Sequence, residues 1–182
     1  MKRKTFDKIV TSVGALLTVF LLVVAALANW GASFAADSVS SQLEAQKITM
    51  PKASEFAADT DADVLAYFTS RENQLMSTGK DAQMYADHYI ALHMSHMPTY
   101  AEASAAARSA TGEEKVAKEA VVETVFKGNM LRGTLLTAYA FGTLGSLAGY
   151  GALASLVGAF LMLLLTVAGY LHIRRTPESA TI

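Results

Sequence analysis

The side chains with the clearest capacity for chemistry gather in one stretch, residues 88–97, which contains His88, His93, His96 and Met97. Imidazole binds copper in either oxidation state and a thioether favours Cu(I), so this combination is typical of a copper site outside the cytoplasm. On a helix, His93 would share a face with His96 and Met97, because residues three and four positions apart are neighbours. His88 lies five positions before His93 and would fall on a different face.

A structural explanation of these residues is simpler. Methionines at helical spacing beside aromatic and aliphatic residues usually fill a core, and a histidine on an acidic surface is usually solvated. We therefore predict no metal and no other cofactor, and we keep His93, His96 and Met97 as the candidate ligands for copper.

Other classes of active site lack their characteristic residues. The chain has no Cys, which excludes disulfides, thiolate zinc sites and a cysteine nucleophile. Asp59, Asp61 and Asp63 lack the glycine and distal glutamate of a calcium loop, and they suit a helix N-terminus. There is no phosphate-binding glycine loop, no G-x-S-x-G motif and no basic tract interleaved with aromatic residues, so we predict neither an enzyme nor a nucleic-acid partner.

The elements that would position these residues belong to a chain of 182 residues that is 52% hydrophobic. No charged residue occurs from Ile9 to Trp30, and about twenty apolar helical residues cross a hydrocarbon core of about 30 Å. Basic residues dominate positions 1–8, which by the positive-inside rule keeps the N-terminus in the cytoplasm. We predict a cytoplasmic N-terminus over 1–8 and a transmembrane helix over 9–30.

The alternative for this first segment is a cleaved signal peptide. Ala26-Leu27-Ala28 has the small-x-small form of a cleavage site, and the residues before the apolar run are basic. The apolar run is longer than the roughly 7–15 residues of a usual signal peptide, which favours a retained helix.

A second apolar segment, 133–172, precedes Arg174 and Arg175. Its length is about twice what one crossing needs. One long helix that contains a transmembrane helix at about 147–171 would keep the tail, 173–182, in the cytoplasm. The alternative, a hairpin that turns near 149–151, would place both arginines outside, against the charge rule.

Small residues recur along this segment at Gly142, Gly145, Gly149, Ala154 and Gly158. Two of the pairs are spaced by four, and we predict that the set forms one helix-packing face, because small residues let helices approach closely in a bilayer. Its partner would be either the first span, at Gly14 and Thr18, or another protein.

Between the spans, residues 31–132 show helical spacing and acidic residues outnumber basic ones, which disfavours anionic lipid headgroups. We expect a helix capped by Asp59 or Thr60 that runs to Met76, and a second that is capped by Asp81 and ended by Pro98. A last helix would start at Thr111 and be interrupted near Gly128-Asn129. The predicted fold is all-α, with two transmembrane helices flanking a small extracytoplasmic helical bundle.

Several short motifs also carry a resemblance. They are the run from Ser40 to Thr49, Tyr85-Ala86 followed by His93, Tyr100-Ala101-Glu102, Thr124-Val125-Phe126, and the run from Asn129 to Leu136. In these the chain resembles a family of small two-span envelope proteins of actinobacteria that often carry the label aromatic ring-opening dioxygenase. The resemblance implies a plasma-membrane location and two spans. The dioxygenase label finds no support in the residues, since His93 is the one histidine that matches and no set of two histidines and a carboxylate can be assembled.

Two functions of different classes follow. The first is a non-catalytic accessory or scaffolding subunit of a larger plasma-membrane complex, such as a respiratory one, whose partners are the lipid bilayer, other membrane subunits and a second copy of the chain. The second is a membrane-anchored extracytoplasmic module for sensing or for copper. Both place the two termini in the cytoplasm and the central domain outside.

Overall fold

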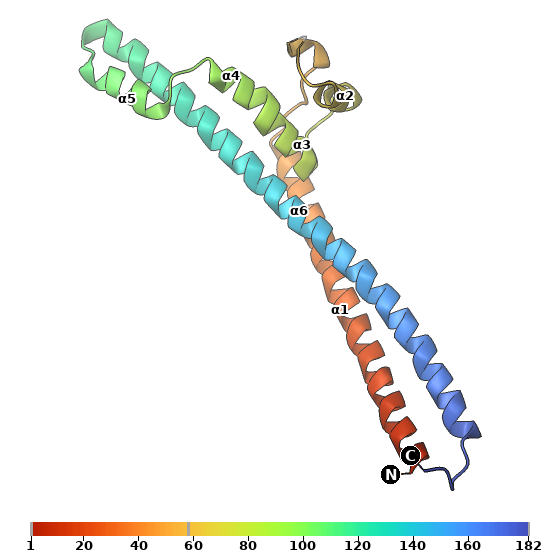
Figure 1. Cartoon of the computed structure of the whole chain (residues 1–182). Helices are drawn as coiled ribbons and strands as arrows, with labels where there is room; N and C mark the ends of the chain where they lie inside the picture. The colour runs from red at the N-terminus through yellow and green to blue at the C-terminus, as the bar shows by residue number, and fades with distance from the viewer. Residues whose placement is uncertain (1, 58, 182) are drawn as a thin grey trace. The chain divides into compact units, whose positions relative to one another are not determined.

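The computed structural model describes residues 2–57 and 59–181 and is built from helices (Figure 1). No strand occurs among these residues, which hold only two isolated bridges, Lys2 with Thr181 and Thr49 with Leu75. The predicted all-α fold is therefore confirmed. In chain order the helices are α1 (Arg3–Ala45), η1 (Ala53–Glu55), α2 (Ala62–Arg71), α3 (Gly79–Met84), the π-helical η2 (Tyr85–Ile90), α4 (Ala91–Ser95), α5 (Tyr100–Ser109) and α6 (Gly112–Arg175).

The chain divides into two compact units. The terminal unit comprises residues 1–34 and 144–182, and the central unit comprises residues 35–143. Helices α1 and α6 each contribute one part to each unit, while η1 and the helices from α2 to α5 belong to the central unit alone.

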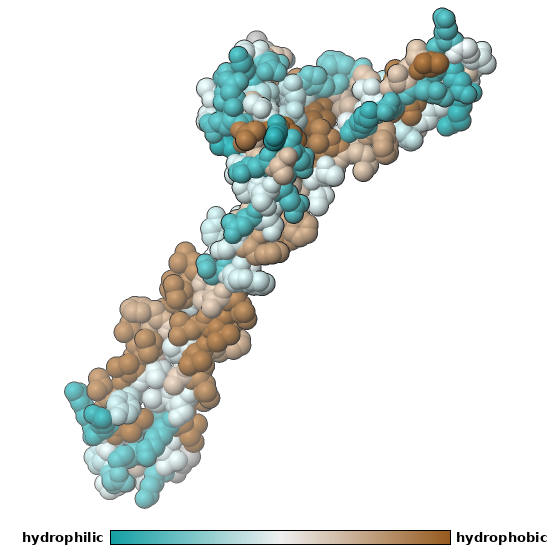
Figure 2. All heavy atoms as spheres, turned by 180° about the vertical axis from the view of Figure 1, so that it is seen from behind, coloured by the Kyte–Doolittle hydropathy of each residue, from teal (hydrophilic) through white to brown (hydrophobic). Residues whose placement is uncertain are grey.

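The terminal unit consists of two antiparallel helical segments whose large side chains face outward. Both α1 and α6 are long and apolar enough to cross a membrane, and only 11% of the most apolar window of each is buried inside the chain. A core helix of a soluble protein would be mostly buried, so these surfaces suit lipid. Figure 2 shows a hydrophobic band over this unit, with hydrophilic residues at the end that carries the chain termini.

Small residues form the seam between the two segments. In α1 the more buried positions recur at alternating steps of three and four: Gly14, Thr18, Leu21, Ala25, Ala28 and Ala32. In α6 the same steps connect Gly145, Ala148, Ala152, Ser155, Ala159, Met162, Thr166 and Gly169. This spacing is that of a left-handed helix pair, and the small side chains let the two backbones come close.

The central unit has a conventional hydrophobic core with large side chains. Fully buried members include Leu43 of α1, Phe68 of α2 and Leu135 of α6, together with Met50 and Met76 from the connections. Leu135 explains why the second apolar segment is longer than one crossing, because its first part fills this core instead of facing lipid.

The central helices differ from expectation at their ends. Helix α2 begins after its cap Asp61 and ends at Arg71, not Met76, because Asn73 adopts a left-handed conformation (φ 59°). The chain then turns back, and the Met76 amide donates to the Ile48 carbonyl at 2.9 Å. The next helix is capped by Thr78, not Asp81, which instead occupies the third helical position and closes a capping box.

Helix α6 begins at Gly112, next to the expected start at Thr111, and it is unbroken. It runs for 64 residues, so the interruption predicted near Gly128-Asn129 is wrong. The helix also continues through 149–151, and no hairpin turn occurs there.

Candidate functional site

The residues of the His/Met stretch lie in different surroundings. The Nδ1 atom of His93 donates to the Tyr89 carbonyl oxygen at 2.8 Å, and the His93 ring lies 4.5 Å from the Tyr89 ring between centroids. His96 is exposed and follows the end of α4, while Met94 packs against the core. Among the residues that the structure describes, no three His, Asp or Glu side chains surround a point that could hold a metal ion.

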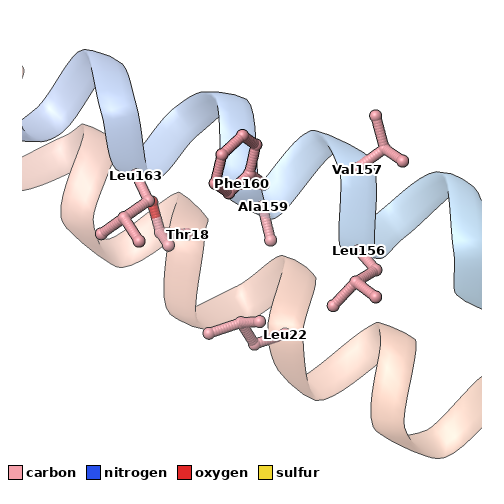
Figure 3. Close-up of a pocket in the computed structure, with 7 residues that line it drawn as sticks. All are labelled: Thr18, Leu22, Leu156, Val157, Ala159, Phe160 and Leu163. Atoms are coloured by element: carbon pink, nitrogen blue, oxygen red, sulfur yellow. The ribbon is translucent and has the colours of Figure 1, made fainter.

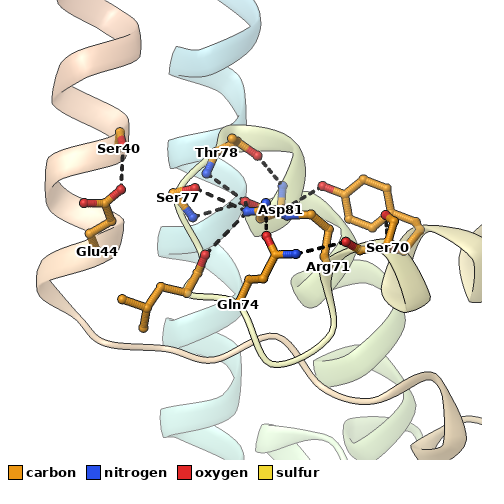
Figure 4. A network of polar contacts seen from close by, with 10 residues as sticks. Ser40, Glu44, Ser70, Arg71, Gln74, Ser77, Thr78 and Asp81 are labelled. Carbon is orange, nitrogen blue, oxygen red and sulfur yellow. Dashed lines mark hydrogen bonds and ion pairs between the residues drawn. The ribbon is translucent and has the colours of Figure 1, made fainter.

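The most concentrated polar cluster lies around the buried Asp81 carboxylate, at the N-terminus of α3 (Figure 4). Arg71 Nε donates to Asp81 Oδ1 at 2.8 Å and Arg71 Nη2 to Oδ2 at 2.7 Å, a bidentate pair. The Tyr67 hydroxyl donates to Oδ1 at 2.7 Å. The backbone amides of Ser77 and Thr78 donate to Oδ2 at 3.1 and 2.9 Å.

These contacts set the protonation states of the cluster. Burial alone would raise the pKa of Asp81, but the hydrogen bonds from Arg71 and Tyr67 outweigh it and lower the pKa to about 2. Burial and the hydrogen bond to Asp81 raise the pKa of Tyr67. The Asp81 side chain is only 1% exposed and both its oxygens are occupied. It therefore offers no open position to a substrate, and the arrangement serves to hold α2 against α3.

A second polar contact joins the π-helical segment to α6. Arg132 Nη2 donates to Asp87 Oδ1 at 3.0 Å, and Arg132 Nε donates to the Ala86 carbonyl oxygen at 3.3 Å. The Ala86 carbonyl oxygen also accepts from the backbone amide of Ala91, so Arg132 adds a second donor to this carbonyl of the π-helical segment.

The residues predicted to form the packing face divide between the two units. In the terminal unit Gly145 is buried, Gly149 faces Ala32 and Gly158 faces Leu21. Gly14 and Thr18 lie in the same seam, so the contact is with the first span, which was one of the two alternatives. In the central unit, Gly142 lies against Gly79, where an added Cβ would be 3.3 Å from the Gly79 Cα atom.

Ala154 was wrongly assigned to this face, since it is exposed. Nine residues separate it from Gly145, and at 3.6 residues per turn that is about 180° around the helix. Ala152 and Ala159, at 7% and 1% exposed, occupy the seam instead.

An apolar groove opens beside the seam of the terminal unit (Figure 3). Its volume is about 400 Å³, with Thr18 and Ala159 at its base and Leu22, Leu156, Phe160 and Leu163 among the side chains that line it. The Thr18 hydroxyl donates to the Gly14 carbonyl of its own helix at 2.9 Å, so it is satisfied within the chain. The groove can therefore accept an apolar side chain or acyl chain, and it has no group for chemistry.

Comparison of the chain with protein-family models, curated proteins and solved structures finds no match. The function therefore has to be argued from the residues of this chain. The cluster that sequence reasoning missed, Asp81 with Arg71 and Tyr67, had one local signal, the Thr78-x-x-Asp81 capping box.

Proposed function

We propose that this protein is a non-catalytic integral membrane subunit that anchors and scaffolds a larger plasma-membrane complex, such as a respiratory one. The observation that carries the proposal is the terminal unit, whose two apolar helices bury only 11% of their most apolar windows inside the chain. The envelope location implied by the resemblance to two-span actinobacterial proteins agrees with it.

The topology of the proposal rests on the register of the seam. Thr11 faces Gly169 and Ala32 faces Gly149, so Trp30 falls level with Tyr150. Aromatic rings are enriched at the interface of a bilayer. From Trp30 back to Ile9 is about 30 Å at 1.5 Å per residue, one hydrocarbon core. At the other end of the unit residues 2–8 lie beside residues 172–181. Lys4 pairs with Glu178 there, and basic residues outnumber acidic ones in both segments, which favours a cytoplasmic location for both.

The scaffold role rests on what the side chains can do. The buried carboxylate of the central unit is fully paired, and the groove of the terminal unit has an apolar lining with a small-residue base. A bulky side chain from another transmembrane helix fits such a depression as a knob fits a hole. In the proposed complex the groove receives a helix of a neighbouring subunit.

Topology can be tested cleanly because the chain has no Cys. Single-cysteine variants Ser109→Cys and Ser179→Cys would be exposed to a membrane-impermeant maleimide on intact cells. We expect labelling at position 109 and none at 179 until the membrane is permeabilised. Labelling of position 179 on intact cells would overturn the proposed orientation.

Assembly is tested by purification of the tagged full chain in mild detergent, followed by mass spectrometry of the proteins that accompany it. We expect defined membrane subunits, and we expect Phe160→Ala, at the groove, to release them. Leu165→Ala removes a similar exposed side chain outside the groove and should retain them. A chain that purifies alone, at monomer or dimer size under all conditions, would refute the scaffold role.

A further inference from the structure

The α5–α6 hairpin of the central unit carries an open groove that the scaffold proposal does not use. Helix α5 lies antiparallel to the first turns of α6 (Figure 1), and a groove of about 420 Å³ runs between them. The rings of Tyr100 and Phe126 line it, 6.2 Å apart between centroids, and remain 48% and 51% exposed. The buried residues of α5 are Ala103 and Ala107. Two alanines contribute little hydrophobic free energy, so the hairpin resembles one half of a packed bundle.

The polar residues of the groove are complementary to one another but do not meet. On α5, the hydrogen-bond donors Ser104 and Arg108 are four residues apart, and on α6 the acceptors Glu119 and Glu123 are also four apart. Ser104 Oγ is buried without a hydrogen-bond partner, and no ion pair of Arg108 occurs among the described residues. Glu123 pairs with Lys127 of its own helix, with Oε1 and Nζ 2.7 Å apart.

We propose that this groove is the interface between two copies of the chain, whose hairpins form a four-helix bundle. In that bundle Arg108 of one copy lies opposite Glu119 of the other, and Ser104 lies opposite Glu123. The second copy also covers the rings of Tyr100 and Phe126.

The membrane anchors determine which symmetry this pairing has. Two copies inserted in one bilayer in the same orientation are related by a two-fold axis along the membrane normal, so their α6 helices run parallel. Each α6 can then lie beside the antiparallel α5 of the other copy, as neighbours do in an up-down four-helix bundle. When the two-fold axis runs along the hairpin helices, Arg108 of one copy stands at the level of Glu119 of the other, and Ser104 at the level of Glu123. Both pairs are satisfied by one register, which favours a second copy as the occupant.

The charge of the groove disfavours the other occupants. Two glutamates on its α6 side repel anionic lipid headgroups and polyanions. In a single copy the Ser104 hydroxyl has no hydrogen-bond partner. In the two-fold pair each copy's Ser104 can donate to the Glu123 carboxylate of the other copy.

The experiment uses the full chain in nanodiscs and measures self-association by light scattering. We expect a dimer for the natural chain and at least about tenfold weaker self-association for Arg108→Glu and for Glu119→Arg, because each places two like-charge pairs in the interface. Differently tagged Arg108→Glu and Glu119→Arg chains, when mixed, should restore the dimer, since both interface pairs are then of opposite charge. This rescue also shows that the variants fold.

Glu114→Arg is the matched control, because it makes the same charge change on α6 outside the groove, and it should leave the dimer intact. A monomeric natural chain at all concentrations would overturn the proposal, as would dimers of the single variants at natural strength. Capture of a different protein or of lipid in the groove would also overturn it. Co-purification of other subunits with one copy of this chain would refute the dimer while leaving the scaffold function standing.

Discussion

The two units of this protein are built from parts of the same two helices, yet they are stabilised in opposite ways. The central unit buries large side chains, such as Phe68 and Leu135, and one fully paired carboxylate. The terminal unit turns its leucines outward and keeps glycine, alanine and threonine in the seam. In water, burial of a large apolar side chain is favourable, but a side chain in lipid gains little from moving between equally apolar surroundings. Close backbone contact is then what remains to hold the helices together.

The comparison is tested most strongly at Asp81. Replacement by Ala removes the ion-pair partner of Arg71 and the acceptor of the Tyr67 hydroxyl, and we expect the central unit to lose about 3–5 kcal/mol of unfolding free energy. Hydrogen exchange measured by mass spectrometry should show lower protection across 62–95 and unchanged protection in the spans. Asp59→Asn, at an exposed position, is the control and should change neither. Equal loss of protection in both units would show that they do not differ as described.

Acid should weaken the central unit selectively. The pKa of Asp81 is lowered to about 2 by the hydrogen bonds that overcome its burial. Its stabilisation, about 2 kcal/mol, is therefore complete above pH 4 and is lost as the pH falls from about 4 to 2. Denaturant unfolding of the natural chain and of Asp81→Asn at pH 7, 4 and 2.5 should show a difference in stability that shrinks over this interval. A difference that stays constant down to pH 2.5 would contradict the assignment.

The terminal unit should respond to the smallest possible enlargement of its seam. An added Cβ at Gly14 would lie 2.8 Å from Thr166 Oγ1, whereas at Gly31 it would meet nothing within 4 Å. We expect Gly14→Ala to weaken pairing of the helices by about 1–3 kcal/mol. Gly31→Ala should be neutral or stabilise α1 by about 0.5–1 kcal/mol.

Pairing can be measured as the yield of a cross-link between Asp7→Cys and His172→Cys with a short bifunctional thiol reagent, since Asp7 Oδ2 and His172 Nε2 lie 3.7 Å apart. The yield should fall with Gly14→Ala and not with Gly31→Ala. A fall of similar size for both variants would mean that the seam does not depend on close contact.

The smallest effect is expected from a solvated ion pair of the central unit. Lys127 and Glu123 are 72% and 64% exposed, and Lys127→Ala should barely change the unfolding free energy because water and salt screen this pair. Thermal unfolding followed by circular dichroism, at low and high salt, would measure it. A loss comparable to that of Asp81→Ala would show that exposed charge, not burial, holds the central unit.

The all-α fold and the two long apolar helices could be predicted from the sequence because run length and composition are local properties. Helix ends in the central unit could not, since the left-handed Asn73 that ends α2 is fixed by pairing with a distant segment. The prediction of the helix-packing face was only partly correct. Spacing by four shows that two residues are neighbours, but it does not show which of them points toward the other helix. Gly158 contacts Leu21, whereas Ala154, four positions earlier, is exposed.

The polar cluster was missed for a related reason. The sequence shows the capping box of Thr78 and Asp81. The other members of the cluster, Arg71 and Tyr67, come from the preceding helix, and they reach the Asp81 carboxylate because the turn at Asn73 brings α2 and α3 together. The copper ligands considered at the outset remain untested by titration. The contact of His93 with Tyr89 gives this histidine a structural partner that its sequence neighbours did not reveal.

The seam also has a consequence in time. Thr166 follows its contact partner Gly14 by 152 positions, so at about 5–20 residues per second the ribosome delivers the second half of the contact roughly 8 to 30 s after the first. During that interval this part of the α1 seam, with Gly14 and Thr18, has no partner helix from its own chain. A chain truncated before Thr166 would keep that part of the seam uncovered.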